Sequence, residues 1–159
     1  MRVFHDIFDK IISIENLIPS WKEFRIGKKN RPDTLEFERN LEDNIWQLHD
    51  ELRNKKYKHS PYISFYIHDP KLRHIHKAYV RDRVLHHAIV THLDPIFEPG
   101  FIFDSYSCRI NKGTHRGISR FVSQARKISL NFNQPAWVLK CDVKKFFASI
   151  DQNVLLNIL

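Results

Sequence analysis

Apolar residues recur at helical spacing in three stretches of the chain. The first stretch follows Asp33, which can cap a helix. Glu36 comes three residues later, which is the spacing of a capping box. Its expected buried residues are Phe37, Leu41, Ile45, Leu48 and Leu52. The second stretch predicts a helix over residues 81–97 that stops near Pro95, with a buried face of Leu85, Ala88, Ile89, His92, Leu93 and Ile96. The third predicts a helix over residues 114–130, with an inward face of Ile118, Phe121, Val122, Ala125 and Ile128.

Alternating aromatic and β-branched residues predict strands elsewhere. Tyr62–Ile67 and Arg73–Tyr79 lie on either side of a turn and are expected to pair as a β-hairpin. Residues 132–142 (FNQPAWVLKCD) predict a third strand, which needs a pairing partner from the hairpin or from later chain. Near the N-terminus we expect a short helix and then a basic, aromatic loop over residues 19–33, and a last helix begins after Asp151, a possible cap. This order of elements predicts an α+β fold.

Composition narrows the class of protein. The chain has 159 residues, 42% of them hydrophobic, which is enough for one domain with a buried core, or for one domain plus a piece of another. Its net charge of +8 favours polyanionic partners, although a basic protein without such a partner has the same composition. Cys108 and Cys141 are isolated, which fits a reducing, cytoplasmic location. No apolar run is long enough to span a membrane, so no membrane partner is expected.

The segment from residue 137 to residue 151, WVLKCDVKKFFASID, holds the candidate metal chemistry. Asp142 ends an apolar run, and a carboxylate at a strand end is a ligand that suits Mg²⁺. Two-metal phosphoryl transfer would need a second acidic element; alternatively, Asp142 only caps a turn. Lys144 and Lys145 could hold a triphosphate, or could form a solvated basic turn. A ring at Phe146 or Phe147 could block a 2′-hydroxyl, or could belong to the core.

Cations are concentrated in two further places. The segment KLRHIHKAYVRDR contains Lys71, Arg73, Lys77, Arg81 and Arg83, with Tyr62, Phe65, Tyr66 and Tyr79 nearby for base stacking. It could instead be a solvated face in which Arg81 or Arg83 pairs with Asp82. His74 and His76 have a spacing found in zinc sites, but the sequence identifies no further ligands. The second place is a glycine-containing loop that could grip a nucleic-acid backbone through Arg109, Lys112 and Arg116.

The order of these blocks resembles one known family. YVRDRVLHHAIVTHLDPIFEPGFIFDSYSCRINKGTHRGI, followed by WVLKCDVKKFFASIDQNVLLNIL, is similar to the front half of the bacterial reverse transcriptases of group II introns, retrons and diversity-generating retroelements. That family has a basic hairpin, an RDR helix, a block around SYG and a block around DVKKFF, in this order. The resemblance covers residues 60–159, and residues 1–59 match loosely, as an N-terminal extension.

The resemblance implies a right-hand polymerase fold, with an N-terminal helical extension over residues 1–59, fingers over 60–134 and the start of a palm over 135–159. It implies that Asp142 is the first catalytic aspartate and a Mg²⁺ ligand, and that Phe147 selects deoxynucleotides. It places the incoming triphosphate against the backbone of Val143, Lys144 and Phe146 and against the basic hairpin, where the nearest matches are Lys71, Arg73 and Arg81. The expected nucleic-acid contacts are Arg83, Arg109, Lys112 and Arg116. Ser107 stands where the family pattern has glycine.

The sequence departs from the family in lacking a YxDD element, the second acidic part of the site. We therefore predict a fragment of an RNA-directed DNA polymerase that is inactive alone and needs a later palm and thumb segment. Its expected partners are an RNA template, a DNA or RNA primer and dNTPs, with Mg²⁺ only in the complete enzyme. The alternatives are a non-catalytic RNA-binding module and a soluble basic domain that binds another protein. Val138, Leu139 and the VLLNIL helix are expected to expose apolar surface and to favour self-association.

Overall fold

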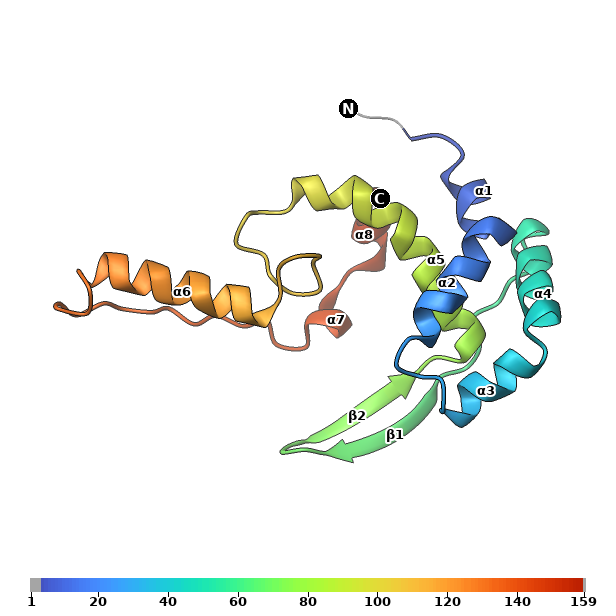
Figure 1. Ribbon diagram of the computed structural model, residues 1–159, viewed down its shortest axis with the longest axis horizontal. Helices are drawn as coiled ribbons and strands as arrows, with labels where there is room; N and C mark the ends of the chain where they lie inside the picture. Colours follow the sequence, from blue (N-terminus) through green and yellow to red (C-terminus); the bar gives the residue numbers. More distant parts are fainter. Residues whose placement is uncertain (1–3, 159) are drawn as a thin grey trace. The chain divides into compact units, whose positions relative to one another are not determined.

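The regular secondary structure of the described residues consists of helices and one β-hairpin, which confirms the α+β class. The computed structural model describes residues 4–158, which divide into two units after Phe101 (Figure 1). The elements of the first unit are α1 (Ile7–Ile12), α2 (Ile14–Arg25), α3 (Pro32–Arg39), α4 (Leu41–Arg53), β1 (Ile63–His68), β2 (Leu72–Lys77), α5 (Val80–Phe97) and the 3₁₀ helix η1 (Glu98–Gly100). Those of the second are α6 (Thr114–Ile128), α7 (Phe146–Ser149) and α8 (Gln152–Ile158).

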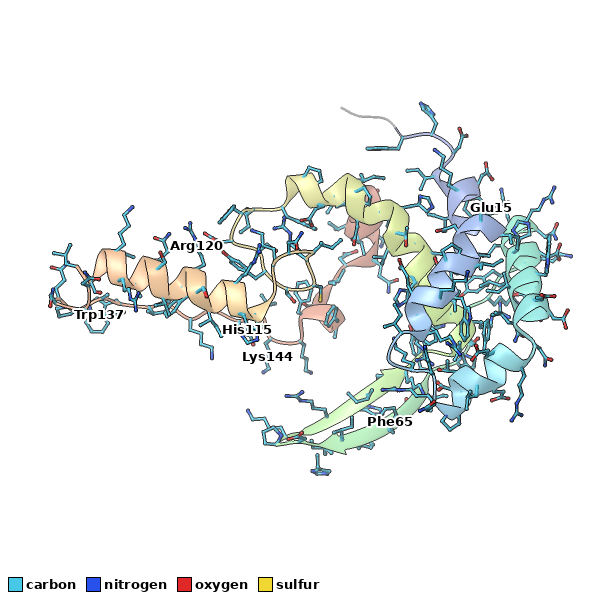
Figure 2. The ribbon with its side chains drawn as sticks, in the orientation of Figure 1. Glu15, Phe65, His115, Arg120, Trp137 and Lys144 are labelled. Atoms are coloured by element: carbon cyan, nitrogen blue, oxygen red, sulfur yellow. The ribbon has the colours of Figure 1, made fainter. Side chains whose placement is uncertain are left out.

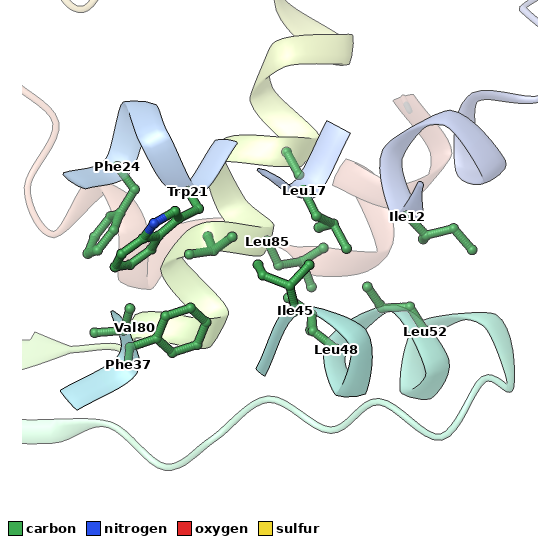
Figure 3. Packing of buried hydrophobic residues seen from close by; sticks show 12 residues of the cluster. Ile12, Leu17, Trp21, Phe24, Phe37, Ile45, Leu48, Leu52, Val80 and Leu85 are labelled. Carbon is green, nitrogen blue, oxygen red and sulfur yellow. The ribbon is translucent and has the colours of Figure 1, made fainter. Parts of the chain in front are cut away.

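One apolar core fills the first unit and draws on helices α1 to α5 (Figure 3). It buries the predicted α4 face at Ile45, Leu48 and Leu52, with Leu41 packed at its margin. Two of the predicted α5 residues, Leu85 and Ala88, are buried, and Ile89 packs against the same core. The other predicted α5 residues, His92, Leu93 and Ile96, are half-buried. The periodicity of these two helices therefore predicted the interior of the unit correctly.

The predicted loop over residues 19–33 is wrong for its first part, because α2 continues through Pro19 to Arg25. Leu17, Trp21 and Phe24 lie on one side of this helix and are almost completely buried. The ring of Trp21 contacts that of Phe37, with centroids 5.0 Å apart. Burial of two large aromatic side chains outweighs the backbone hydrogen bond that a proline cannot donate.

The helix predicted after Asp33 is in fact two helices, because Asn40 adopts a non-helical backbone between α3 and α4. The amide of Asn44 donates to the carbonyl of Phe37 at 2.9 Å and bridges this break. The predicted cap is also wrong. α3 begins at Pro32 after Arg31, and the Asp33 carboxylate is used in ion pairs instead.

The hairpin is antiparallel, and its register divides the side chains between two faces. The pairs Ser64–His76, Tyr66–His74 and His68–Leu72 lie on one face, which we call the ring face. The pairs Ile63–Lys77, Phe65–Ile75 and Ile67–Arg73 lie on the other. The side chains stand out from both sides of the ribbon (Figure 2), and both β1 and β2 are largely exposed. The predicted hairpin is confirmed, although its second strand runs from Leu72 to Lys77.

The second unit has no buried hydrophobic side chain among residues 102–158. Of the α6 face that was expected to point inward, Ile118, Phe121 and Ile128 are exposed, and Val122 and Ala125 are half-buried. Residues 132–142 do not form the predicted strand, since no described segment pairs with them. Asp151 caps α8 as predicted, because its carboxylate accepts from the backbone N–H of Asn153 at 2.8 Å. Among the described helices, none combines the length and apolarity needed to cross a bilayer.

Candidate nucleic-acid interface

The base of the hairpin is fixed to α3 by two cations that share one carboxylate. Lys77 Nζ lies 2.7 Å from Asp33 Oδ2, and Arg83 Nη2 lies 2.6 Å from the same oxygen. The Arg83 guanidinium also covers the ring of Phe24, 4.8 Å from its centroid. Burial raises the pKa of Asp33. The hydrogen bonds and the positive charges of Lys77 and Arg83 together outweigh this effect, so the pKa lies below its usual range. Arg83, a predicted nucleic-acid contact, is thus held by α3.

Arg81 is held in the same way by α4. Its guanidinium binds Glu51 through two bonds, Nη2 to Oε2 at 2.5 Å and Nη1 to Oε1 at 3.3 Å. This hydrogen bonding is the main cause that raises the pKa of Arg81 and lowers the pKa of Glu51. The guanidinium also lies over the ring of Tyr57, with 5.4 Å between Arg81 Cζ and the ring centroid. A triphosphate could engage Arg81 only in competition with Glu51.

Asp82, between these two arginines, is completely buried. Its carboxylate accepts a hydrogen bond from the hydroxyl of Tyr57 at 2.7 Å and one from the backbone N–H of Ser60 at 3.3 Å, and Arg81 Nε lies 3.9 Å away. Burial raises the pKa of Asp82, but the bonds from Tyr57 and Ser60 outweigh it, so the pKa falls below its ordinary value. Burial and the bond to Asp82 raise the pKa of Tyr57. Sequence reasoning missed this group, although Asp82 lies on the same helical stripe as Leu85.

The cations near the hairpin tip are arranged differently. Lys71 and Arg73 are exposed, and neither forms an ion pair within the part of the chain that the structure describes. Within the basic segment, Lys77, Arg81 and Arg83 therefore have internal partners, whereas Lys71 and Arg73 present their charge to solvent. The sequence also allowed a solvated basic face in which Arg81 or Arg83 pairs with Asp82. The tip of the hairpin is solvated in this way, whereas the pairing with Asp82 is only a long contact of Arg81.

Four histidines and two tyrosines lie next to one another beside these cations. Tyr66 stacks on His74 with centroids 4.4 Å apart, and His74 lies 4.2 Å from His76. No group of three or more histidine, cysteine, aspartate or glutamate side chains among residues 4–158 is arranged to hold a metal. His74 and His76 therefore lack the further ligands that a zinc site needs.

Asp142 is exposed and belongs to the second unit, whereas the hairpin belongs to the first. Among residues 4–158, Asp142 belongs to no group of three or more histidine, cysteine, aspartate or glutamate side chains that could hold a metal, and a pair of Mg²⁺ ions needs more ligands than one carboxylate. The turn expected after Asp142 is present, because Lys145 takes a left-handed backbone with φ of 53° before α7. The rings of Phe146 and Phe147 meet edge to face at 5.2 Å, and the side chain of Phe147 is 86% exposed. Neither ring is buried in a core by the described residues. Val143 and Lys144, the other residues expected against a triphosphate, are exposed beside them.

The three cations of the second unit that were expected to contact nucleic acid bind carbonyls of their own loop. Arg109 Nη1 donates to Ile102 at 2.9 Å, Lys112 Nζ to Phe103 at 2.6 Å, and Arg116 Nη1 to Asn111 at 2.5 Å. They stabilise the loop between η1 and α6, in addition to any role toward a nucleic acid. Asp104 accepts from both Arg120 and Tyr106 at 3.0 Å, an arrangement that the sequence did not indicate.

Ser107, which stands where the family pattern has glycine, does not have a positive φ, whereas Cys108 and Asn111 in the same loop do, with φ of 56° and 59°.

Comparison with known proteins adds no relative to this description. A scan against protein-family models found no match to the chain. A search of curated proteins likewise found no matching relative. The family resemblance therefore depends on the order of the sequence blocks alone.

The buried carboxylate gives a prediction about stability and pH. Asp33, Glu51 and Asp82 have lowered pKa values in the folded chain, so the unfolded chain takes up protons first as the pH falls. Their stabilising effect is present above about pH 4 and is lost as the pH falls through the folded pKa values. Tyr57→Phe should lower the free energy of unfolding by about 1–3 kcal/mol at pH 7, because it removes a donor to a buried carboxylate.

Urea unfolding between pH 3 and pH 7 measures both effects. Tyr62→Phe is the matched control, because Tyr62 is exposed and its hydroxyl has no hydrogen-bond partner within residues 4–158. Equal stability of the two variants at pH 7, or a stability that rises on acidification, would contradict the role assigned to Asp82.

Proposed function

We propose that this chain carries the fingers and the first palm segment of an RNA-directed DNA polymerase. The observation that carries the proposal is the division of the cations in the basic segment, residues 71–83, between internal ion pairs and solvent. Lys77, Arg81 and Arg83 are engaged by Asp33 and Glu51, whereas Lys71 and Arg73 stand exposed near the tip without ion pairs to the described residues. Such cations are available for phosphate oxygens, and Arg73 offers a fork that fits them in a bidentate way.

The order of the sequence blocks supports the same function. The hairpin is followed directly by α5 with its RDR triplet, and Asp142 precedes a turn and two phenylalanines. We assign Asp142 to metal binding and Phe147 to sugar selection. In a complete polymerase the primer 3′-hydroxyl would attack the α-phosphate of a dNTP and release pyrophosphate, which requires a second acidic element. Asp142 would contribute one carboxylate to that site, and the second acidic element would supply the others.

A non-catalytic RNA-binding module is the second candidate. It is favoured by the first unit, which has its own apolar core and presents the exposed hairpin without needing a metal. Both candidates place phosphates at Lys71 and Arg73. They differ in the role of Asp142, which would bind metal in the polymerase and would have no catalytic role in the binding module.

Salt-dependent RNA binding tests the hairpin. Lys71→Ala combined with Arg73→Ala should weaken binding of single-stranded RNA. It should also reduce the slope of log affinity against log salt by about 1.4, since each phosphate contact to a single strand contributes about 0.7. Lys22→Ala combined with Lys29→Ala is the control, because it removes the same charge from exposed positions outside the hairpin. If both double variants lower the slope equally, the hairpin has no special role and only net charge matters.

Primer extension tests the catalytic assignment. A palm segment with a YxDD element, fused to this chain or added in trans, should allow extension of a primer on an RNA template. Asp142→Ala should reduce the rate by at least about a hundredfold, since even groups that only orient metal ligands contribute 10–100-fold. Asp151→Ala removes an acid of the same unit that caps α8 and should leave extension intact. RNA binding without extension, or extension that survives Asp142→Ala unchanged, would favour the binding module.

A further inference from the structure

A continuous row of rings runs along the hairpin and reaches α5. We define the ring row as Tyr66, His74, His76, Tyr62, His59 and His86. Tyr66, His74 and His76 occupy the ring face of the hairpin, Tyr62 precedes β1, and His86 lies on α5. Successive centroids are 4.4, 4.2, 6.3, 4.8 and 5.7 Å apart along the row. All six residues belong to the first unit, so the row does not depend on the placement of the second.

Hydrogen bonds hold two of the imidazoles in place. His76 Nδ1 lies 2.8 Å from the hydroxyl of Ser64, its cross-strand partner. His59 Nδ1 lies 2.6 Å from the carbonyl of Ser60. Side chains that are fixed before a ligand arrives lose less conformational entropy on binding. The row is therefore an ordered surface, although it is exposed.

The outer end of the row offers a flat stacking surface. The Tyr66 and His74 rings are nearly parallel, with 11° between their planes. Tyr66 is nevertheless 63% exposed, so the ring face that does not cover His74 remains accessible. A planar, uncharged ring system can extend this stack without rearrangement of the hairpin. Nucleobases are such ring systems, and stacking on aromatic side chains is how many proteins bind unpaired strands.

The charge around the row fits a phosphodiester chain better than an acidic or a basic peptide. Residues 59–77 contain one acid, Asp69 in the turn, and three cations. Lys77 is neutralised by Asp33, which leaves two cations without ion pairs near the Tyr66 end: Lys71 in the turn, and Arg73 on β2, whose side chain belongs to the opposite face of the hairpin. Along the strand, Tyr66 and His68 are about 7 Å apart, and the turn with Lys71 follows directly. The rings for bases lie on the ring face, and the cations for phosphates lie in the turn at its end and on the opposite face.

We propose that the ring row is a binding site for an unpaired nucleic-acid strand, in which bases stack on the Tyr66–His74 pair and follow the row toward α5. This inference rests on the proposed function, which supplies nucleic acid as the ligand. It adds that the bound segment is single-stranded and that its bases, as well as its phosphates, are recognised. Stacking is tolerant of base identity, so the site carries little sequence preference.

Oligonucleotides with and without bases separate the two kinds of contact. Fluorescence anisotropy would measure the affinity of the full chain for a labelled uridine oligomer and for an abasic oligomer of equal length. The wild-type chain should prefer the oligomer with bases. Tyr66→Ala combined with His74→Ala should weaken that binding by at least about fivefold and leave abasic binding unchanged. Tyr66→Phe combined with His74→Phe keeps the rings and should restore the preference.

The outcomes distinguish this inference from the proposed function. Equal binding of both oligomers by the wild-type chain, or a preference that survives Tyr66→Ala with His74→Ala, would overturn the ring row as a site. If in that case Lys71→Ala with Arg73→Ala still weakens both oligomers, phosphate binding by the hairpin stands. If neither oligomer binds the wild-type chain, both proposals fail. His115→Ala, in exposed α6, is the control for loss of an imidazole, and unchanged thermal unfolding shows that the variants remain folded.

Discussion

The buried carboxylate of Asp82 is the constraint on which the arrangement of the first unit depends. A charge without solvent contact is tolerated only when it is hydrogen-bonded, and its partners here are Tyr57 and Ser60, which lie just before β1. The neighbouring arginines extend this anchor, because Arg81 binds Glu51 on α4 and Arg83 binds Asp33 on α3. One triplet at the start of α5 therefore fixes the hairpin base to two helices.

This anchoring explains how the hairpin can be both rigid at its base and available near its tip. Lys77 at its base forms an ion pair with Asp33, and its two strands are largely exposed to solvent. The same segment thus contains cations with a structural role and cations that face solvent. A cluster of like charges in a sequence does not reveal this division, which depends on where the acids of α3 and α4 fall.

Local pattern predicted most of the first unit, and long-range contacts account for the errors. The α4 and α5 periodicities and the hairpin alternation led to the observed elements, since those patterns determine which face can be buried. Pro19 suggested a loop, but Trp21 and Phe24 gain enough from burial to continue α2. The burial of Asp82 is hard to predict because two arginines flank it, although it lies on the same helical stripe as Leu85. In the second unit, residues 132–142 lack the strand partner that their pattern requires among the described residues, and Trp137 is 97% exposed.

In the proposed function, the Asp82 anchor leaves the hairpin tip and the ring row, and not the RDR triplet, to meet nucleic acid. Backbone amide chemical shifts of the isotope-labelled chain, recorded while single-stranded RNA is added, locate the residues that bind it. The largest shift changes are expected at Tyr66, Lys71, Arg73 and His74, while Arg81 and Arg83 should change little. Changes centred on Arg81 and Arg83, or on the loop that contains Arg109 and Lys112, would contradict this expectation.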